Sequence, residues 1–444
     1  MAARVRCRWS RLLSRRGDAR GLGGAGVDPD GCTAELQVRH STSLKELVPT
    51  VATSNGGVGW ISQKVDGFTE CPTCAGPLRV TGESRSADSG GGVVGSTVCI
   101  DRIGAELLAM QLAAEPGRNV LCSPVGVAAL LSILQPGSEF GLTPEVRESL
   151  RRFEPDLAAL RDFTPLDPPD APLLHLADHL MLIDGAEPRP EWLAAVADQT
   201  TISRAPLTEA KPRLDAWAAL HTGHLITETT VTVDEQTRIV LQNALLFAAR
   251  WARQLTPVSD DAPFHRADGT TGTANYMGCT TDLRFARGDG WRAVRLNYRA
   301  DGLACDLILP RRRISPAELP ADTWAAATAA VTVAEPRPVQ LRVPSLDLTS
   351  GPVDLQPLLE RLGVPLDRDH IMPGLPEIRS AQQVRVMVTE QGTIAAALTE
   401  QWMCSSFPET DPVEFTLDHP FVLRVIDIPT GTALIEAAIL DPAS

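Results

Sequence analysis

The chain has 444 residues, of which 43% are hydrophobic and 22% are charged, a composition typical of a globular protein in water. No run approaches the roughly 20 apolar residues that a membrane-spanning helix needs, so no membrane partner is expected. Residues 96–444 carry 29 Lys and Arg against 46 Asp and Glu. This excess of negative charge argues against nucleic-acid binding, which needs clustered cations.

Residues 1–95 differ in composition from the rest of the chain. They contain 16 of the 34 glycines and lack sustained apolar periodicity, which predicts a low-complexity, disordered extension. The basic start is not followed by the apolar region of a signal peptide, so a cytoplasmic location is favoured over an extracellular one. A transit peptide and a wrongly assigned start codon both stay open. Nine scattered cysteines do not resemble a disulfide framework, and a reducing compartment is the simpler expectation.

Two motifs near the end of this extension resemble parts of functional sites, but the sequence lacks the other residues that each site would need. Cys71 and Cys74 form one half of a zinc-ribbon pattern, but a closed site needs four ligands and no second CxxC follows. We therefore expect no metal, although a separate zinc-dependent binding function of residues 1–95 stays open. Ser89 lies in a motif like that of serine proteases, but its stretch is rich in Gly and Ser. His40 is the only histidine upstream.

The hydrophobic periodicity of residues 96–444 changes from helical to strand-like along the chain. Asp101 is expected to cap a helix, and Ser123 with Pro124 to begin the next one. Residues 239–247 are nearly continuously apolar, which predicts a strand covered on both faces. Two hairpins are predicted, at residues 293–309 and 421–440. Helices first and strands later predict an α+β fold.

Several short stretches follow one another in the order found in one known family. They are residues 119–124, Trp217 with Thr222, Gly223 and Ile226, residues 241–247 with Trp251, and residues 340–344, 358–363 and 415–423. Over residues 96–444 the chain therefore resembles a bacterial-type serpin with an unrelated N-terminal extension. His224 stands where that family usually has glycine. The resemblance implies a helix-rich N-terminal half, three β-sheets and an exposed reactive-centre loop.

Residues 390–399 resemble the hinge of the serpin reactive loop. The resemblance assigns the hinge to Glu390, Gly392, Thr393, Ala395, Ala396, Ala397 and Thr399. A cleaved serpin loop inserts as a new strand within an existing sheet, so alternate side chains enter a packed interior and must be small. Four alternate residues would enter the interior, and all are small: Thr393, Ala395, Ala397 and Thr399. Ile394 and Leu398 would face outward. Without context the run also suits a helix fragment, but its place before the C-terminal strands favours the hinge.

The reactive bond is predicted from the spacing that the resemblance implies. Counting forward from Gly392 gives Ser406–Phe407, which is the bond we predict. Counting backward from residues 419–420 gives Glu409–Thr410, because the loop is longer than usual. Trp402 and Met403 would suit a chymotrypsin-like protease if the bond lay earlier.

The resemblance also implies two regions that support loop insertion. Ser123 and Asn243 match the shutter beneath the opening sheet, and Trp251 matches the breach, where the loop enters. Gly126 occupies the place of a second shutter serine, and Gln382 occupies the place of a histidine. These two departures predict a changed hydrogen-bond network at the shutter.

These features together predict a protease inhibitor and not an enzyme. We expect a monomeric suicide-substrate inhibitor of serine proteases, with cysteine proteases as a second target class. It would hold its target as a covalent acyl-enzyme while the loop inserts, and it would need no cofactor. A non-inhibitory serpin that acts as a binding or chaperone-like protein is the alternative, but the small inward hinge residues favour inhibition. A hydrolase is a weaker rival, because the sequence has no G-x-S-x-G elbow and no HExxH.

Overall fold

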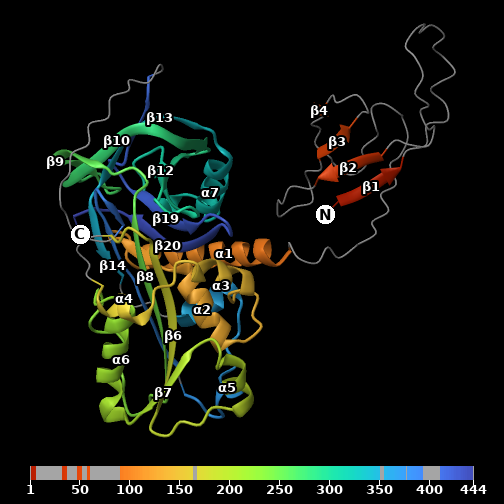
Figure 1. Cartoon of the computed structure of the whole chain (residues 1–444), viewed down its shortest axis with the longest axis vertical. Helices are drawn as coiled ribbons and strands as arrows, with labels where there is room; N and C mark the ends of the chain where they lie inside the picture. Colours follow the sequence, from red (N-terminus) through yellow and green to blue (C-terminus); the bar gives the residue numbers. More distant parts are fainter. Residues whose placement is uncertain are drawn as a thin grey trace. The chain divides into compact units, whose positions relative to one another are not determined.

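The computed structural model describes residues 2–6, 33–37, 48–52, 58–60, 91–163, 168–350, 355–376, 378–393 and 411–443. The chain divides into two compact units, Met1–Asp88 and Ser89–Ser444 (Figure 1). The first unit holds an antiparallel sheet of β1 (Ala2–Arg6), β2 (Thr33–Gln37), β3 (Val48–Ala52) and β4 (Val58–Trp60), in that order. The assignment of residues 1–95 as a low-complexity extension stays a prediction. Cys71 and Cys74 lie outside the described residues.

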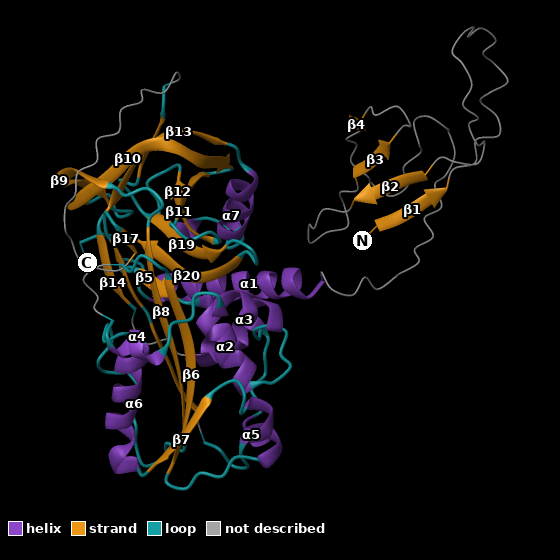
Figure 2. Cartoon of the chain, viewed as in Figure 1, coloured by secondary structure: helices purple, strands orange, loops and turns teal. Residues whose placement is uncertain are grey.

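Among the described residues of the second unit, helices predominate before β8 (Ile239–Arg250), and strands predominate from β8 onward (Figure 2). The helices are α1 (Gly91–Ala114), α2 (Pro124–Leu134), α3 (Pro144–Arg151), α4 (Leu157–Arg161), α5 (Pro190–Val196), α6 (Leu207–His221), η1 (Pro316–Glu318), α7 (Thr323–Val333), α8 (Leu355–Leu362) and α9 (Arg368–Ile371). The predicted start of α2 is confirmed, because the Ser123 side chain accepts a hydrogen bond from the Gly126 N–H and Pro124 begins the helix. All residues of α2 are buried.

The expected helix cap at Asp101 is wrong. Helix α1 begins at Gly91, so Asp101 lies within the helix. Its carboxylate accepts a hydrogen bond from the guanidinium of Arg424, which is almost completely buried. Arg424 also donates to Glu436 Oε1 at 2.7 Å and to the Trp324 carbonyl at 3.0 Å. Asp101 therefore pairs with a buried cation, which would be costly to leave without a counter-charge.

We use the name central sheet for the sheet that contains β8. Its strands are β6 (Leu173–Ile183), β7 (Thr201–Ala205), β8 (Ile239–Arg250), β14 (Leu346–Thr349), β15 (Ile378–Gln383), β16 (Arg385–Val388) and β17 (Gly392–Thr393). Every residue of β8 except the last is buried, which confirms the prediction of a strand covered on both faces. β8 pairs antiparallel with β6 and parallel with β15.

The other large sheet of this unit has the order β18–β13–β10–β11–β12–β19–β20–β5, with β9 paired to β10. Its strands are β5 (Val120–Cys122), β9 (Thr256–His265), β10 (Thr271–Gly288), β11 (Trp291–Asn297), β12 (Leu303–Pro310), β13 (Pro336–Pro344), β18 (Val413–Thr416), β19 (Phe421–Asp427) and β20 (Thr432–Ile439). Both predicted hairpins are confirmed, because β11 pairs antiparallel with β12 and β19 with β20.

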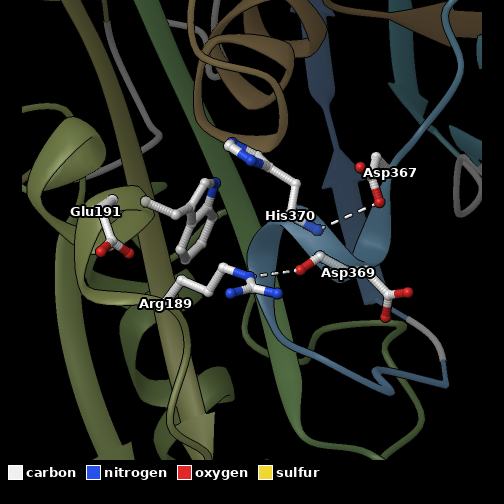
Figure 3. A pocket seen from close by; sticks show the side chains of 6 residues that line it. Arg189, Glu191, Asp367, Asp369 and His370 are labelled. Atoms are coloured by element: carbon white, nitrogen blue, oxygen red, sulfur yellow. Dashed lines mark hydrogen bonds between the residues drawn. The ribbon is translucent and has the colours of Figure 1, made fainter.

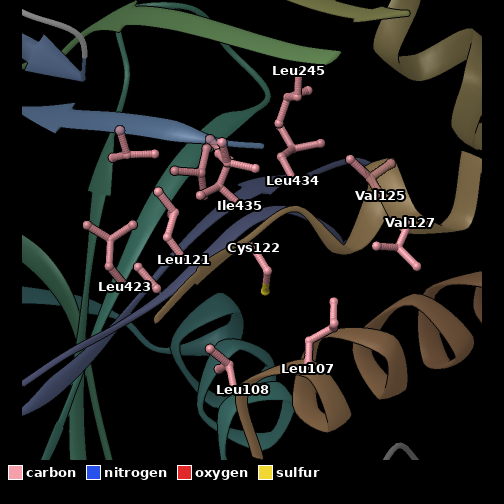
Figure 4. Packing of buried hydrophobic residues seen from close by; sticks show 14 of the residues in the cluster. Leu107, Leu108, Leu121, Cys122, Val125, Val127, Leu245, Leu423, Leu434 and Ile435 are labelled. Carbon is pink, nitrogen blue, oxygen red and sulfur yellow. The ribbon is translucent and has the colours of Figure 1, made fainter. Parts of the chain in front are cut away.

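The main hydrophobic core lies where α1 and α2 pack against these sheets (Figure 4). Leu107 and Leu108 of α1 are buried near Cys122 of β5, and Leu434 of β20 lies beside Leu245 of β8. Burial raises the pKa of the Cys122 thiol well above its usual value, so this cysteine packs as a small apolar side chain. Among the helices that the structure describes, none is both long and apolar enough to cross a membrane.

Candidate functional site: the upper end of the central sheet and the shutter

The predicted hinge begins inside the central sheet. Strand β17 lies between β16 and β8, with Thr393 opposite both Val388 and Ala249. Gly392 lies opposite Arg250, and a Cβ atom at this position would be 2.1 Å from the Ala249 carbonyl oxygen. Only glycine allows this close approach of the two backbones. The first two residues of the predicted insertion are thus already paired as a strand.

Trp251 holds the backbone that leads into β17. Its backbone N–H donates to the Gln391 carbonyl at 2.9 Å, and its indole N–H donates to the Thr389 carbonyl at 2.9 Å. The Leu255 N–H donates to the Glu390 carbonyl at 2.8 Å. The chain after β8 therefore binds three successive carbonyls, where the sequence predicts the breach.

Tyr298 completes this region, although sequence reasoning did not select it. It is buried, its ring stacks on Trp251 with 4.6 Å between centroids, and its hydroxyl lies 2.7 Å from the Thr393 hydroxyl. Burial raises the pKa of Tyr298 well above its usual value, so the phenol keeps its proton for hydrogen bonding. Its only signal in the sequence is that it is one of two tyrosines, placed directly after a predicted strand.

The predicted shutter residues meet below this region. The Ser123 hydroxyl donates to the Leu434 carbonyl at 2.7 Å. The Ser123 backbone makes two bonds to Gln382: its N–H donates to Oε1 at 3.0 Å, and its carbonyl accepts from Nε2 at 2.9 Å. Gln382 therefore connects β15 to the start of α2 with both ends of its amide.

Gly126 leaves little space for a side chain at the predicted shutter. A Cβ atom on Gly126 would lie 2.2 Å from Asn243 Oδ1 and 2.6 Å from Gln382 Nε2. A serine at position 126 would therefore collide first with Asn243 and also with Gln382. In the arrangement observed, Gln382 connects β15 to Ser123.

Asn243 brings an unpredicted carboxyl group into the shutter. Its Nδ2 donates to Oδ1 of Asp178, the opposite residue on β6, at 2.9 Å. Burial raises the pKa of Asp178 to about 7, against the opposing effects of the Asn243 hydrogen bond and the positive charge of Arg147. The charge of this carboxyl group consequently changes near neutral pH.

The remaining predicted site residues cannot be placed. Ala395, Ala396, Ala397 and Thr399 of the hinge, and the Ser406–Phe407 bond, lie outside the described residues. Below β17, β15 pairs with β8 from Ile378↔Ile239 to Gln383↔Ala244. An inserting loop would have to separate these two strands.

A separate pocket of about 410 Å³ lies between α5 and α9 (Figure 3). Several of its polar groups support the local backbone, since Arg189 Nε donates to the Asp369 carbonyl at 2.8 Å and Asp367 caps α9 through the His370 N–H. Among the described residues, no cluster of three or more His, Cys, Asp or Glu could hold a metal ion.

The geometry of the central sheet is that expected of the strand-inserting class of protein that the sequence resembles. The two-residue strand β17 lies at one end of the sheet, and β8 and β15 pair directly with each other below it.

Comparison with known proteins identifies the family. The serpin family, described as serine protease inhibitors, matches residues 100–442. Putative serpin-Z8 of Oryza sativa subsp. japonica is 28% identical over 422 residues, covering 80% of this chain and 96% of the rice protein. Plasminogen activator inhibitor 1 of Sus scrofa is 25% identical over 384 residues, covering 76% of this chain and 90% of the pig protein.

Solved serpin structures share the fold. The thermophilic serpin tengpin in its native state has a TM-score of 0.63 at 16% identity, covering 81% of this chain and 96% of tengpin. The Arabidopsis serpin AtSerpin1, in its native stressed conformation, has a TM-score of 0.62 at 20% identity, covering 80% of this chain and 99% of the plant protein. The chain belongs to the serpin family and has its α+β fold. A reactive loop and loop insertion are general features of that family, whose members are in general protease inhibitors and not enzymes.

Proposed function

We propose that this chain is a suicide-substrate inhibitor of serine proteases. The observation that carries the proposal is the position of β17 between β8 and β16, in antiparallel register with β8. Continued in the same register, Ala395, Ala397 and Thr399 would lie opposite Phe247, Leu245 and Asn243 of β8. Those three β8 residues are buried, and Leu245 and Asn243 lie on the side of α2. Small side chains are therefore required at the positions where the sequence has them.

The reaction would use the nucleophile of the target. The protease serine Oγ would attack the Ser406 carbonyl, and the bond from that carbonyl to the Phe407 nitrogen would break. The N-terminal part of the loop would stay ester-linked to the protease, and the protein would release a new amino terminus at Phe407. Insertion between β8 and β15 would then carry the protease along, and distortion of its active site would prevent water from releasing it.

The energy for this movement would come from the native fold itself. The β8–β15 pairs are the closed form of a sheet that gains a strand on insertion. The native form would therefore be separated by a kinetic barrier from an inserted form that is more stable still.

The test is incubation of the full chain with trypsin-, chymotrypsin-, elastase- and subtilisin-like proteases, followed by denaturing electrophoresis and mass spectrometry. A band of inhibitor plus protease that survives denaturant is expected, and the mass of the released peptide should place the bond at Ser406–Phe407. Release at Glu409–Thr410 would correct the bond alone. Cleavage without a complex and without a gain in thermal stability would favour a non-inhibitory binding or chaperone-like serpin.

A further inference from the structure

Four aromatic rings fasten α6 to the central sheet. His175 of β6 stacks on His221 of α6 with 5.1 Å between centroids, His221 on Trp217 with 4.4 Å, and Trp217 on His179 of β6 with 5.1 Å. We name these four residues the ring stack. His175 and His179 are buried, and the interplanar angles are 18°, 24° and 22°. The ring stack is therefore a continuous contact between one helix and one strand.

The hydrogen bonds of the ring stack restrict how many protons it can hold. His175 Nδ1 bonds the Glu154 carboxylate, so this nitrogen carries a proton. His175 Nε2 lies 2.8 Å from His221 Nδ1, and that bond needs one nitrogen with a proton and one without. If both rings were charged, two N–H groups and two positive charges would face each other across this distance.

The charges around His221 oppose its protonation. Burial, together with the smaller effects of the neighbouring His175 and His179, lowers the pKa of His221 to about 4. Burial also lowers the pKa of His179, which bonds Gln242 Oε1 at 3.0 Å and Ser203 Oγ at 2.7 Å.

The other charged groups near the ring stack bond to named partners or are exposed. Glu154, from the segment between α3 and α4, bonds His175. Asp215 of α6 pairs with Lys211 of the same helix at 2.6 Å. Asp178 of β6 bonds Asn243 at the shutter, and Arg161 of α4 and Arg204 of β7 are exposed. β8 contributes uncharged Gln242.

The helix that the ring stack fastens belongs to a brace across the sheet. α6 packs against β6, β7 and β8 (Figure 1). The segment that follows it reaches Asp234, whose Oδ2 lies 3.3 Å from an Arg379 guanidinium nitrogen on β15. We name residues 207–234 the brace, since it is attached to β6 by the ring stack and to β15 by this ion pair. Separation of β8 from β15 therefore has to break this ion pair or move the brace.

We propose that the ring stack is an acid-sensitive fastening: in mild acid it releases α6, and the uncleaved loop then inserts into the central sheet more readily. The first half of this inference concerns the fold alone, and the second half rests on the proposed function. In acid, such a protein would lose its capacity to trap a protease without being cleaved.

Hydrogen exchange of the full chain at pH 7.5 and pH 5.0, corrected for the intrinsic exchange rate, tests the first half. A histidine pKa of about 4 in the fold against 6.5 when exposed favours opening of α6 at pH 5.0 by at most about thirtyfold. We expect the protection of residues 207–221 to fall by a factor of that order, with little change in β19 and β20.

Two variants separate protonation from simple loss of packing. His221→Phe keeps a ring in the stack without a titrating group, and His221→Asn keeps a hydrogen-bonding side chain; both should lose most of the pH effect. His370→Asn, at an exposed histidine of α9, is the control and should behave as wild type. Equal protection of α6 at both pH values in wild type, or an unchanged pH effect in both His221 variants, would overturn the proposal.

The second half is tested by storage of the uncleaved protein at both pH values, followed by a trapping assay at pH 7.5. Wild type should lose trapping activity several-fold faster at pH 5.0, and His221→Phe should not. If α6 opens in acid while the loss of activity is equally slow at both pH values, the coupling to insertion is wrong. If no complex forms under any condition, the proposed function fails, but the exchange result still decides whether the ring stack senses acid.

Discussion

The hydroxyl of Tyr298, in the turn between β11 and β12, lies 2.7 Å from the hydroxyl of Thr393 in β17. Both residues are buried, and Tyr298 stacks on Trp251, whose indole binds the backbone just before β17. One aromatic pair thus contacts both the side chain and the backbone of the hinge. The position of β17 therefore depends on a contact between two different sheets.

The first prediction concerns this hydroxyl pair. Tyr298→Phe keeps the ring stacked on Trp251 but removes the hydrogen bond, which contributes about 1 kcal/mol. We expect β17 to leave the sheet about fivefold more often and the reactive loop to be cleaved correspondingly faster by a non-target protease. The rate of loop cleavage, followed by mass spectrometry, measures this effect.

A double-mutant cycle provides the control. Thr393→Val removes the same bond from the other side, so Tyr298→Phe and Thr393→Val together should cost little more than either alone. Thr393→Ser keeps a hydroxyl and should remain close to wild type. Additive effects of the two substitutions would show that the hydroxyls act independently of each other.

The second prediction concerns the inward parity of the hinge. Ala397→Arg would place a charge opposite Leu245, which is 5% exposed, once the loop inserts, and a buried charge without a partner costs several kcal/mol. The loop should then be cleaved as an ordinary substrate, with no complex that survives denaturant. Ile394→Arg, on the predicted outward parity, is the matched control and should still trap the protease. Equal trapping by both variants would refute the register proposed for insertion.

Periodicity and local motifs predicted the parts of this fold that depend on neighbouring residues. The continuous apolar run of β8, the cap at Ser123 and both hairpins are local patterns, and the structure confirms them. Asp101 was assigned wrongly for the same reason. A polar residue before an apolar helical face looks like a cap, whereas its real partner, Arg424, is 323 residues away.

The candidate functional site depends even more than the fold on contacts between residues far apart in the sequence. The Gln382–Ser123 bonds join residues 259 positions apart, and the Tyr298–Thr393 contact joins residues 95 apart. A periodic pattern in the sequence cannot identify contacts between residues so far apart. The resemblance to serpins assigned residues to the shutter, but it presented Gly126 and Gln382 as two separate departures. Only the geometry shows that Gly126 leaves room for Asn243 Oδ1 and for Gln382 Nε2.

The third prediction tests this accommodation. Gly126→Ser alone should destabilise the protein by about 1–3 kcal/mol, because the new Cβ would overlap Asn243 Oδ1 and Gln382 Nε2. Adding Gln382→His shortens the colliding side chain and should recover part of that loss. The midpoint of urea unfolding compares both variants with wild type. Equal or greater instability of the double variant would mean that Gln382 is not what excludes a serine.

The fourth prediction concerns the pH dependence that Asp178 introduces. Its folded pKa of about 7 lies above the ordinary value of 3.8, so the folded state binds a proton more tightly than the unfolded state. The contribution of Asp178 to stability should therefore fall as the pH rises from about 4 to 7, at roughly 1.4 kcal/mol per pH unit at most, whereas His221 contributes a slope of opposite sign between about pH 4 and 6.5. Asp178→Asn keeps an acceptor for Asn243 Nδ2 and should remove the Asp178 contribution, so that the variant differs from wild type in slope and is more stable near neutral pH. Urea midpoints at pH 5.0 and pH 7.5 measure the slope, with Asp170→Asn, at an exposed carboxylate, as the control. If wild type and Asp178→Asn show the same slope, the Asp178 carboxyl group does not titrate at the shutter in this range.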